Sequence, residues 1–330
     1  MSNTTMISTA AITLNLISLI GTIIIGFLCI FMLSMLLPSI IRKHDVVLIL
    51  VTNNYLALLA FALVAIPTNI DIVRGDYNLY IGMETFGCRI RAYIFYSSVA
   101  IIFHTFVLQA CFRFFRVVYP LHVYLQNGIT YIVVIPILWF ISFLFMIPIY
   151  VWHDIKFIHR ENVCLLAMHS VRGFIWSILI IYGIPIVVIN IIYIRLMRFI
   201  RQSSKIASTR AKRDVIVIQR IVLVVSILTL MGIPSVVLKL MLPFTDVGKP
   251  LFYRSQNIVI VTGIIVLSFM LVYVTPQLKE VFIRTRKSGK VTSIYTQQRS
   301  ILSDKSSNNN TTDYEQLSSG VYTITFVESP

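Results

Sequence analysis

Charged residues are scarce in this sequence. They make up 12% of its 330 residues, about half the share found in an ordinary soluble domain. Hydrophobic residues make up 57%, and the mean hydropathy is +0.85. A soluble chain of this length cannot bury so much apolar surface in one core. The scarcity of charge therefore excludes an ordinary soluble enzyme and a disordered chain, and it indicates that most of the chain lies in lipid.

Acidic residues and cysteines are few as well. Only 13 Asp and Glu stand against 28 Lys and Arg, which gives a formal net charge of +15. In an apolar chain this excess of cations is typical of loops on the inner face of a membrane, and we expect no nucleic-acid partner. The 4 cysteines stand in a chain so apolar that a secreted scaffold held together by disulfides is excluded as well.

Long apolar runs are what the sequence has in abundance. A helix that crosses a bilayer needs about 20 mostly apolar residues. No run shows the short alternating pattern of a membrane β-barrel. The sequence therefore predicts an all-α membrane protein with a bundle of seven transmembrane helices. The predicted spans are 11–37, 46–70, 87–118, 129–151, 173–200, 215–243 and 253–274.

The distribution of cations predicts the orientation. If the N-terminus is outside the cell, 19 of the 28 Lys and Arg fall in inner segments, as the positive-inside rule requires. We therefore expect a multi-pass protein of the plasma membrane with residues 1–10 outside. Residues 287–330 are rich in Ser, Thr, Asn and Gln and predict a disordered cytoplasmic tail. Asn3 begins an Asn-Thr-Thr sequon and is a predicted glycosylation site.

Two cysteines and one arginine stand out on the third predicted span. Cys88 at its start and Cys164, between spans four and five, both lie on the outer side, where a disulfide is chemically allowed. Arg113 follows Cys88 by 25 residues, roughly 37 Å of helix, which places it at the inner end. An arginine at that depth is either an anchor at the lipid interface or a functional group.

A series of motifs occurs in order along the spans. Phe112-Arg113-Phe114 ends span three, Trp139 lies in span four, and Pro185 and Tyr193 are eight residues apart in span five. Pro234 lies in span six, and Tyr273 closes span seven before the stretch 276–282. With this set, residues 11–286 resemble the rhodopsin-like (class A) G protein-coupled receptors. The resemblance implies a receptor domain over 11–286 with a short amphipathic eighth helix, and a disulfide between Cys88 and Cys164.

The resemblance also implies a mechanism. An extracellular ligand would cause an outward swing of span six, which admits a heterotrimeric G protein at the inner face, and an arrestin could bind the phosphorylated tail. Asp214 at the foot of span six could form an ion pair with Arg113 that favours the closed state. The implied coupling residues are Arg113, Phe112, Phe114, Tyr193, Asp214, Pro234 and Tyr273.

Departures from the family pattern mark a divergent member. Phe112 replaces the acid that normally precedes the arginine, so an intrahelical ion pair is lost and we expect raised basal signalling. Gly232 stands where a tryptophan is typical. Leu58 and its neighbours replace the aspartate of span two and offer no side-chain oxygen, so we expect no bound sodium. We also expect no other metal, since His104 in span three is more often a packed residue than a ligand, and no cofactor.

The ligand is expected to bind among aromatic side chains. Phe95 stands where amine receptors carry an aspartate, which disfavours an amine. Acidic residues in the outer loops would steer a basic peptide, so a peptide is favoured, while a small molecule or a lipid stays open. The predicted ligand-contacting residues are Tyr93, Phe95, Tyr96, Trp176, Tyr253, Gln256 and Asn257.

Two other classes of protein were weighed. A transporter or channel would carry more polar groups along its spans than His104, Gln109 and Asn190. A membrane enzyme would need a catalytic or metal-binding cluster of His, Asp and Glu, and the sequence shows no such spacing. We therefore expect a receptor rather than an enzyme.

Overall fold

The computed structural model describes most of the apolar part of the chain. Its described residues are 2–43, 45–77, 79, 83–159, 161–167, 170–203, 226, 229–230, 232–233, 236–237 and 252–274. All of them belong to one compact unit, Met1–Val281. The predicted span over 215–243 is thus described at only seven residues. Asp214, Pro234, the predicted eighth helix and the predicted tail lie outside the described residues.

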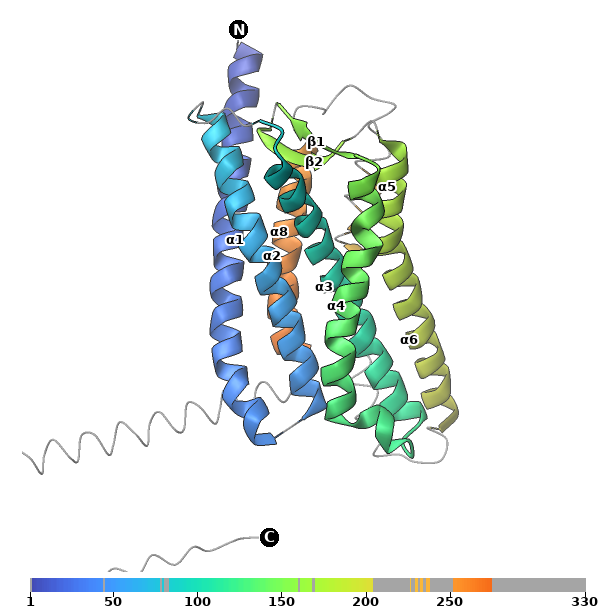
Figure 1. Cartoon of the computed structure of the whole chain (residues 1–330). Coiled ribbons are helices and arrows are strands. Elements are labelled where there is room, and N and C mark those ends of the chain that lie inside the picture. The colour runs from blue at the N-terminus through green and yellow to red at the C-terminus, as the bar shows by residue number, and fades with distance from the viewer. Residues whose placement is uncertain are drawn as a thin grey trace, which may run out of the picture. The chain divides into compact units, whose positions relative to one another are not determined.

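The described chain is a bundle of long helices (Figure 1). Six helical stretches are long and apolar enough to cross a membrane, and they match six of the seven predicted spans. The first helix begins at Ser2, so it includes residues that the sequence assigned to the outer N-terminus. The helices are α1 Ser2–Lys43, α2 Val46–Asp76, α3 Phe86–Val118, α4 Gly128–Val151, α5 Val171–Ile178, α6 Ile184–Ser203 and α8 Phe252–Val274.

Helix α3 is the centre of the bundle. It packs against α2, α4 and α6, while α1 packs against α2 and α8. In its most apolar stretch 67% of the residues are buried, against 17% in α4. The side chains that α4 leaves exposed are large and apolar, such as Phe140, as a helix in contact with lipid requires.

Side-chain hydrogen bonds tie the helices together within the apolar interior. The indole N–H of Trp139 on α4 donates to Oδ1 of Asn53 on α2 at 3.0 Å. The hydroxyl of Tyr55 on α2 donates to the carbonyl of Ser268 on α8 at 3.0 Å. Because a buried polar group without a partner destabilises the fold, such bonds fix which faces of the helices meet.

The fifth span is one helix interrupted by a π-helical turn, Leu179–Gly183, between α5 and α6. Pro185 follows at once, and its nitrogen has no hydrogen to donate to the turn before it. The wider turn accommodates the missing hydrogen bond and shifts the side chains that follow onto another face. Tyr182, inside this turn, lies between α3 and span six: its ring is 4.8 Å from that of Phe103 on α3 and faces Gly232 of span six.

A β-hairpin between α4 and α5 covers one end of the bundle (Figure 1). Strand β1, Ile155–Ile158, pairs antiparallel with β2, Val163–Leu166. Asn162 at the turn has a φ of 50°, a left-handed conformation that asparagine tolerates better than most residues. We call this end the hairpin end and the opposite end, where α3 finishes, the Arg113 end.

Candidate functional site

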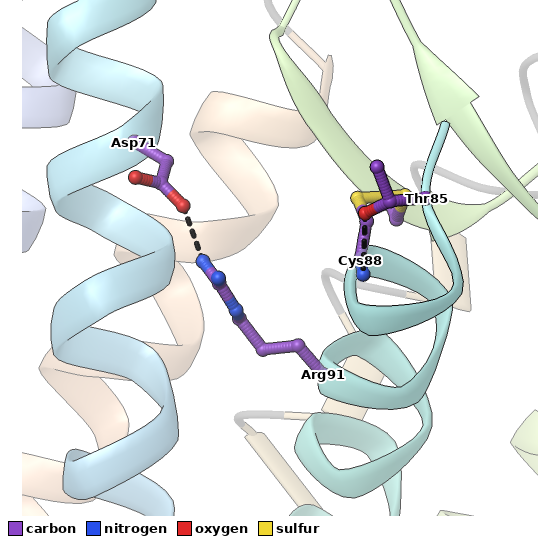
Figure 2. Close-up of a disulfide and its surroundings, with 5 residues drawn as sticks. Asp71, Thr85, Cys88 and Arg91 are labelled. Atoms are coloured by element: carbon purple, nitrogen blue, oxygen red, sulfur yellow. Dashed lines mark hydrogen bonds and ion pairs between the residues drawn. A yellow bond between two sulfur atoms is a disulfide. The ribbon is translucent and has the colours of Figure 1, made fainter. Parts of the chain in front are cut away.

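A disulfide joins the hairpin to the first turn of α3. Cys88 and Cys164 are bonded, which confirms the sequence prediction, and the bond links residues 76 apart in the chain. The hydroxyl of Thr85 accepts a hydrogen bond from the backbone N–H of Cys88 at 3.2 Å (Figure 2). This N-cap fixes the start of α3 beside the disulfide, so the hairpin is held covalently at its helix.

Two tyrosines hold the backbone of β2. The N–H of Leu166 donates to the hydroxyl of Tyr96 on α3, and its carbonyl accepts from the hydroxyl of Tyr253 on α8, both at 3.2 Å. Because the backbone of this one residue bonds to both helices, the hairpin is fixed relative to α3 and α8 at once.

A buried ion cluster connects the hairpin to three helices. Arg254 on α8 donates from Nε to Glu161 of the hairpin turn and from Nη2 to Asp76 at the end of α2, each at 2.8 Å. The side chain of Asn15 on α1 donates to the other oxygen of Asp76 at 2.6 Å. The three charged side chains are at most 9% exposed, so water screens these interactions little.

Two further ion pairs lie at the hairpin end and are more exposed. Arg91 on α3 contacts Asp71 on α2 (Figure 2), with 42% and 27% of the side chains exposed. Arg172 lies 3.6 Å from Asp154. Four acids at the hairpin end, Asp71, Asp76, Asp154 and Glu161, therefore have an arginine beside them.

A pocket lies beneath the hairpin, between α2, α3, α8 and the fifth span. Its walls are mainly apolar and aromatic, and its polar part consists of amide and hydroxyl side chains and one ion pair. Its described lining consists of Asn15, Ala65, Thr68, Asn69, Ile72, Phe95, Tyr96, Val99, Glu161, Val163, Leu165, Ser177, Ile181, Tyr182, Tyr253, Arg254, Gln256, Asn257 and Ile260. Apolar walls with a few placed polar groups are typical of a ligand site.

The structure brings five of the seven predicted ligand-contacting residues together in this lining, namely Phe95, Tyr96, Tyr253, Gln256 and Asn257. It places the other two against α4 and outside the described lining. The hydroxyl of Tyr93 donates to the carbonyl of Phe143, and the indole of Trp176 donates to the carbonyl of Phe145, both at 2.8 Å.

The Arg113 end gathers part of the predicted coupling set. Arg113 makes no ion pair within the described ranges, and its guanidinium lies close enough to Tyr193 of α6 for an electrostatic interaction. Phe112 is buried in an apolar cluster with Tyr131 of α4, ring to ring at 5.2 Å. Tyr273 is described and 53% exposed.

Phe114, which follows Arg113 in the chain, contacts residues close to it in the sequence. The ring of Phe114 lies 6.1 Å from that of Tyr119, just beyond the end of α3. Phe114 therefore packs against the loop that follows α3, while Phe112 packs against α4.

Sequence reasoning missed the role of Arg254. The available signal was an arginine at the start of an apolar span, because a cation that close to lipid needs a partner. It also missed Asn69, whose side-chain oxygen accepts a hydrogen bond from Asn257 at 2.7 Å. Within the described ranges, no three His, Cys, Asp or Glu side chains gather as a metal site requires.

The family assignment rests on this arrangement and on a family comparison. Residues 39–278 match the family model of the 7 transmembrane receptor (rhodopsin family), and the chain belongs to that family. It is therefore a multi-pass membrane protein and a signalling receptor, and its family consists of receptors rather than enzymes. A comparison with curated protein sequences returned no match.

Proposed function

We propose that this receptor binds an extracellular ligand in the pocket beneath the hairpin and responds by activating a heterotrimeric G protein at the Arg113 end. The observation that carries the proposal is α3 itself, which contributes Phe95 and Tyr96 to the pocket and Arg113 to the opposite end. From Phe95 to Arg113 the helix runs 18 residues, about 27 Å. A shift of α3 or of the spans packed on it therefore reaches both ends.

Span six supplies the movement in this proposal. Arg113 has no ion pair among the described residues, so a docking partner that reaches its guanidinium would break no ion pair with any of them. An outward swing of span six about Pro234 would expose Arg113, Tyr193 and the basic segments that follow α6, and would let Tyr273 approach them. An ion pair between Arg113 and Asp214 in the closed state stays a prediction.

The ligand proposed from the sequence is a peptide, steered by outer acids. The aromatic walls of the pocket support a peptide ligand more than the acidic residues do. Each of four acids at the hairpin end lies beside an arginine, namely Asp71, Asp76, Asp154 and Glu161. Exposed Glu84 remains available to attract a basic segment. A small molecule or a lipid would suit the same walls.

The remaining proposals concern location and partners. The hairpin end would face outside the cell at the plasma membrane, with Asn3 glycosylated, and the tail over 287–330 would recruit an arrestin after phosphorylation. Removal of glycans by a glycosidase, followed by gel mobility of wild type and Asn3→Gln, tests the orientation directly.

The experiment for coupling uses purified receptor in lipid nanodiscs. Nucleotide exchange by purified heterotrimers of each Gα class is measured without ligand, and then with basic peptides, lipids and amines. We expect basal exchange with at least one heterotrimer and its loss in Arg113→Ala. Arg116→Ala is the matched control, because Arg116 is exposed one turn further along the same helix.

Two results would refute the coupling proposal. The first is exchange that is absent with every heterotrimer under every stimulus. The second is an equal rate in wild type and Arg113→Ala when both variants are folded and present at the same concentration.

A further inference from the structure

The charges that line the pocket are paired with each other. Among the described lining residues only Glu161 and Arg254 are charged, and they form an ion pair with 2.8 Å between Glu161 Oε2 and Arg254 Nε. The rest of the guanidinium is held by Asp76 from behind the lining. A ligand group that enters the pocket therefore meets no described charge that lacks a partner.

An ionic ligand group would be unfavourable in this setting. A charge that leaves water for an apolar pocket needs a partner of opposite sign there. To provide one, the cluster would have to share a group that already makes a charge-assisted hydrogen bond inside the cluster, and its charged side chains are at most 9% exposed. The walls around it are aliphatic or aromatic, such as Ile72, Val99 and Ile181, and they solvate an ion poorly.

The polar groups of the pocket suit an uncharged partner. Asn257 donates to Asn69, and Asn69 donates to Thr22 at 3.4 Å, so this chain of amides is already ordered. Gln256 lines the pocket beside it and makes no hydrogen bond to another described residue. A free carboxamide both donates and accepts, so it matches a carbonyl, a hydroxyl or an amide of a ligand.

We infer that the ligand group that enters this pocket is uncharged and largely apolar, with a neutral hydrogen-bonding group directed at Gln256. The inference deepens the proposed function and rests on it for the identity of the site. It concerns only the part of the ligand that enters the pocket. If the ligand is a peptide, its charged side chains and free ends stay outside the hairpin.

The experiment measures the charge preference of the pocket without any known ligand. In a Cys29→Ser, Cys111→Ser background, Gln256→Cys places a thiol in the pocket, and Ser177→Cys does so from the opposite wall. Purified receptor in nanodiscs is treated with three methanethiosulfonates that carry a hydroxyethyl, a sulfonatoethyl or a trimethylammonioethyl group. Labelling rates are followed by mass spectrometry and divided by those of Glu84→Cys, an exposed position on the same end.

Relative to Glu84→Cys, we expect the neutral reagent to label the pocket thiols at least about tenfold faster than either charged reagent. The reason is that only the charged groups lose hydration without gaining a partner. Arg254→Gln removes the cation between two carboxylates and should raise labelling by the cationic reagent over the anionic one. Glu161→Gln is the matched control, because it leaves the Arg254–Asp76 pair and should create no preference of that kind.

Equal rates for neutral and charged reagents would overturn the inference, and so would absence of labelling by all three. Faster labelling by the anionic reagent would also overturn the inference if this preference disappeared in Lys239→Gln. That result would mean that Lys239, outside the described residues, supplies the pocket with a cation. The assay contains no G protein. If the neutral reagent shows no preference but nucleotide exchange is intact, only the proposed ligand class is refuted. If the preference is found but nucleotide exchange is absent, only the coupling proposal is refuted.

Discussion

Asn162 at the tip of the hairpin lies directly on Gly75 in the last turn of α2. A Cβ added to Gly75 would lie 2.6 Å from both Cβ and Cγ of Asn162, closer than packed carbon atoms approach. Gly75 is buried, and Asp76 beside it belongs to the ion cluster. The absence of a side chain at Gly75 therefore allows the hairpin turn to reach Arg254.

Gly75→Ala should loosen the hairpin. The added methyl group cannot be accommodated by a rotamer change alone, since Cβ of Asn162 is itself in the way, and we expect a loss of about 1–3 kcal/mol of stability. Thermal unfolding of purified receptor in detergent measures it. Asn162→Gly should restore most of the loss, because it removes the obstructing side chain and glycine accepts the left-handed conformation there. No rescue by Asn162→Gly would contradict this explanation.

Two of the arginines at the hairpin end, Arg254 and Arg91, should differ greatly in the strength of their ion pairs. Arg254→Gln leaves two buried carboxylates without their cation and should cost about 3 kcal/mol or more. Arg91→Gln removes the partner of Asp71 in a pair that water reaches, and should cost at most about 1 kcal/mol. Unfolding temperatures of the two variants under one condition provide the comparison, and similar shifts for both would show that burial does not decide the difference.

Phe112→Asp should lower basal G protein activation. It places a carboxylate next to Arg113 and would hold the guanidinium by about 1 kcal/mol, roughly a fivefold change in the equilibrium between states. Nucleotide exchange without ligand is the measurement. Phe112→Leu is the control, since it keeps an apolar side chain in the cluster with Tyr131 without adding charge. Equal exchange in both variants would mean that lost packing, and not the ion pair, determines the rate.

Gly232 in span six faces the ring of Tyr182, and a Cβ there would lie 3.1 Å from the nearest ring carbon. Alanine for glycine inside a helix normally stabilises by about 1 kcal/mol. We expect that gain for Gly26→Ala in α1, whose nearest neighbours lie at 3.7 Å, and a smaller gain or a loss for Gly232→Ala.

Tyr182→Leu should remove this difference, because it takes away the ring that crowds position 232. Unfolding temperatures of Gly232→Ala in the Tyr182 and Leu backgrounds form a thermodynamic cycle with Gly26→Ala as the reference. The contact would be unimportant if Gly232→Ala and Gly26→Ala stabilised wild type equally. Since Tyr182 also lines the pocket, a real contact would connect the ligand site with span six.

Part of the site could be predicted because its signals are local in the sequence. The aromatic and amide residues Phe95, Tyr96, Tyr253, Gln256 and Asn257 all lie within the first three turns of their helices, at the hairpin end, where the pocket forms. The same reasoning selected Tyr93 and Trp176, which contact α4 instead. Spacing gives the depth of a residue in the membrane but leaves open which neighbour its helix face meets.

The tie between the hairpin and Arg254 could not be predicted in this way. Arg254 is 93 residues from Glu161 and 178 from Asp76, and nothing local in the sequence relates the three. The hairpin itself was expected only as a loop that contains Cys164, because its strands are 4 residues each and too short to show alternation clearly.

By itself the sequence determined that the chain contains membrane-spanning segments, six of which the structure describes as helices long and apolar enough to cross a bilayer, and that its motifs resemble those of a seven-helix receptor. The first follows from the length and apolar character of continuous segments, which a bilayer selects directly. The second follows from the resemblance of short motifs, such as Phe112-Arg113-Phe114, to those of the receptor family. The tertiary structure alone decided which side chains meet: Arg254 with Glu161 and Asp76, Asn162 with Gly75, and Tyr182 with Gly232. In a bundle surrounded by lipid the inner and outer faces of a helix are both apolar. Periodicity therefore does not distinguish them, and only the packing of one helix on another assigns each face its partner.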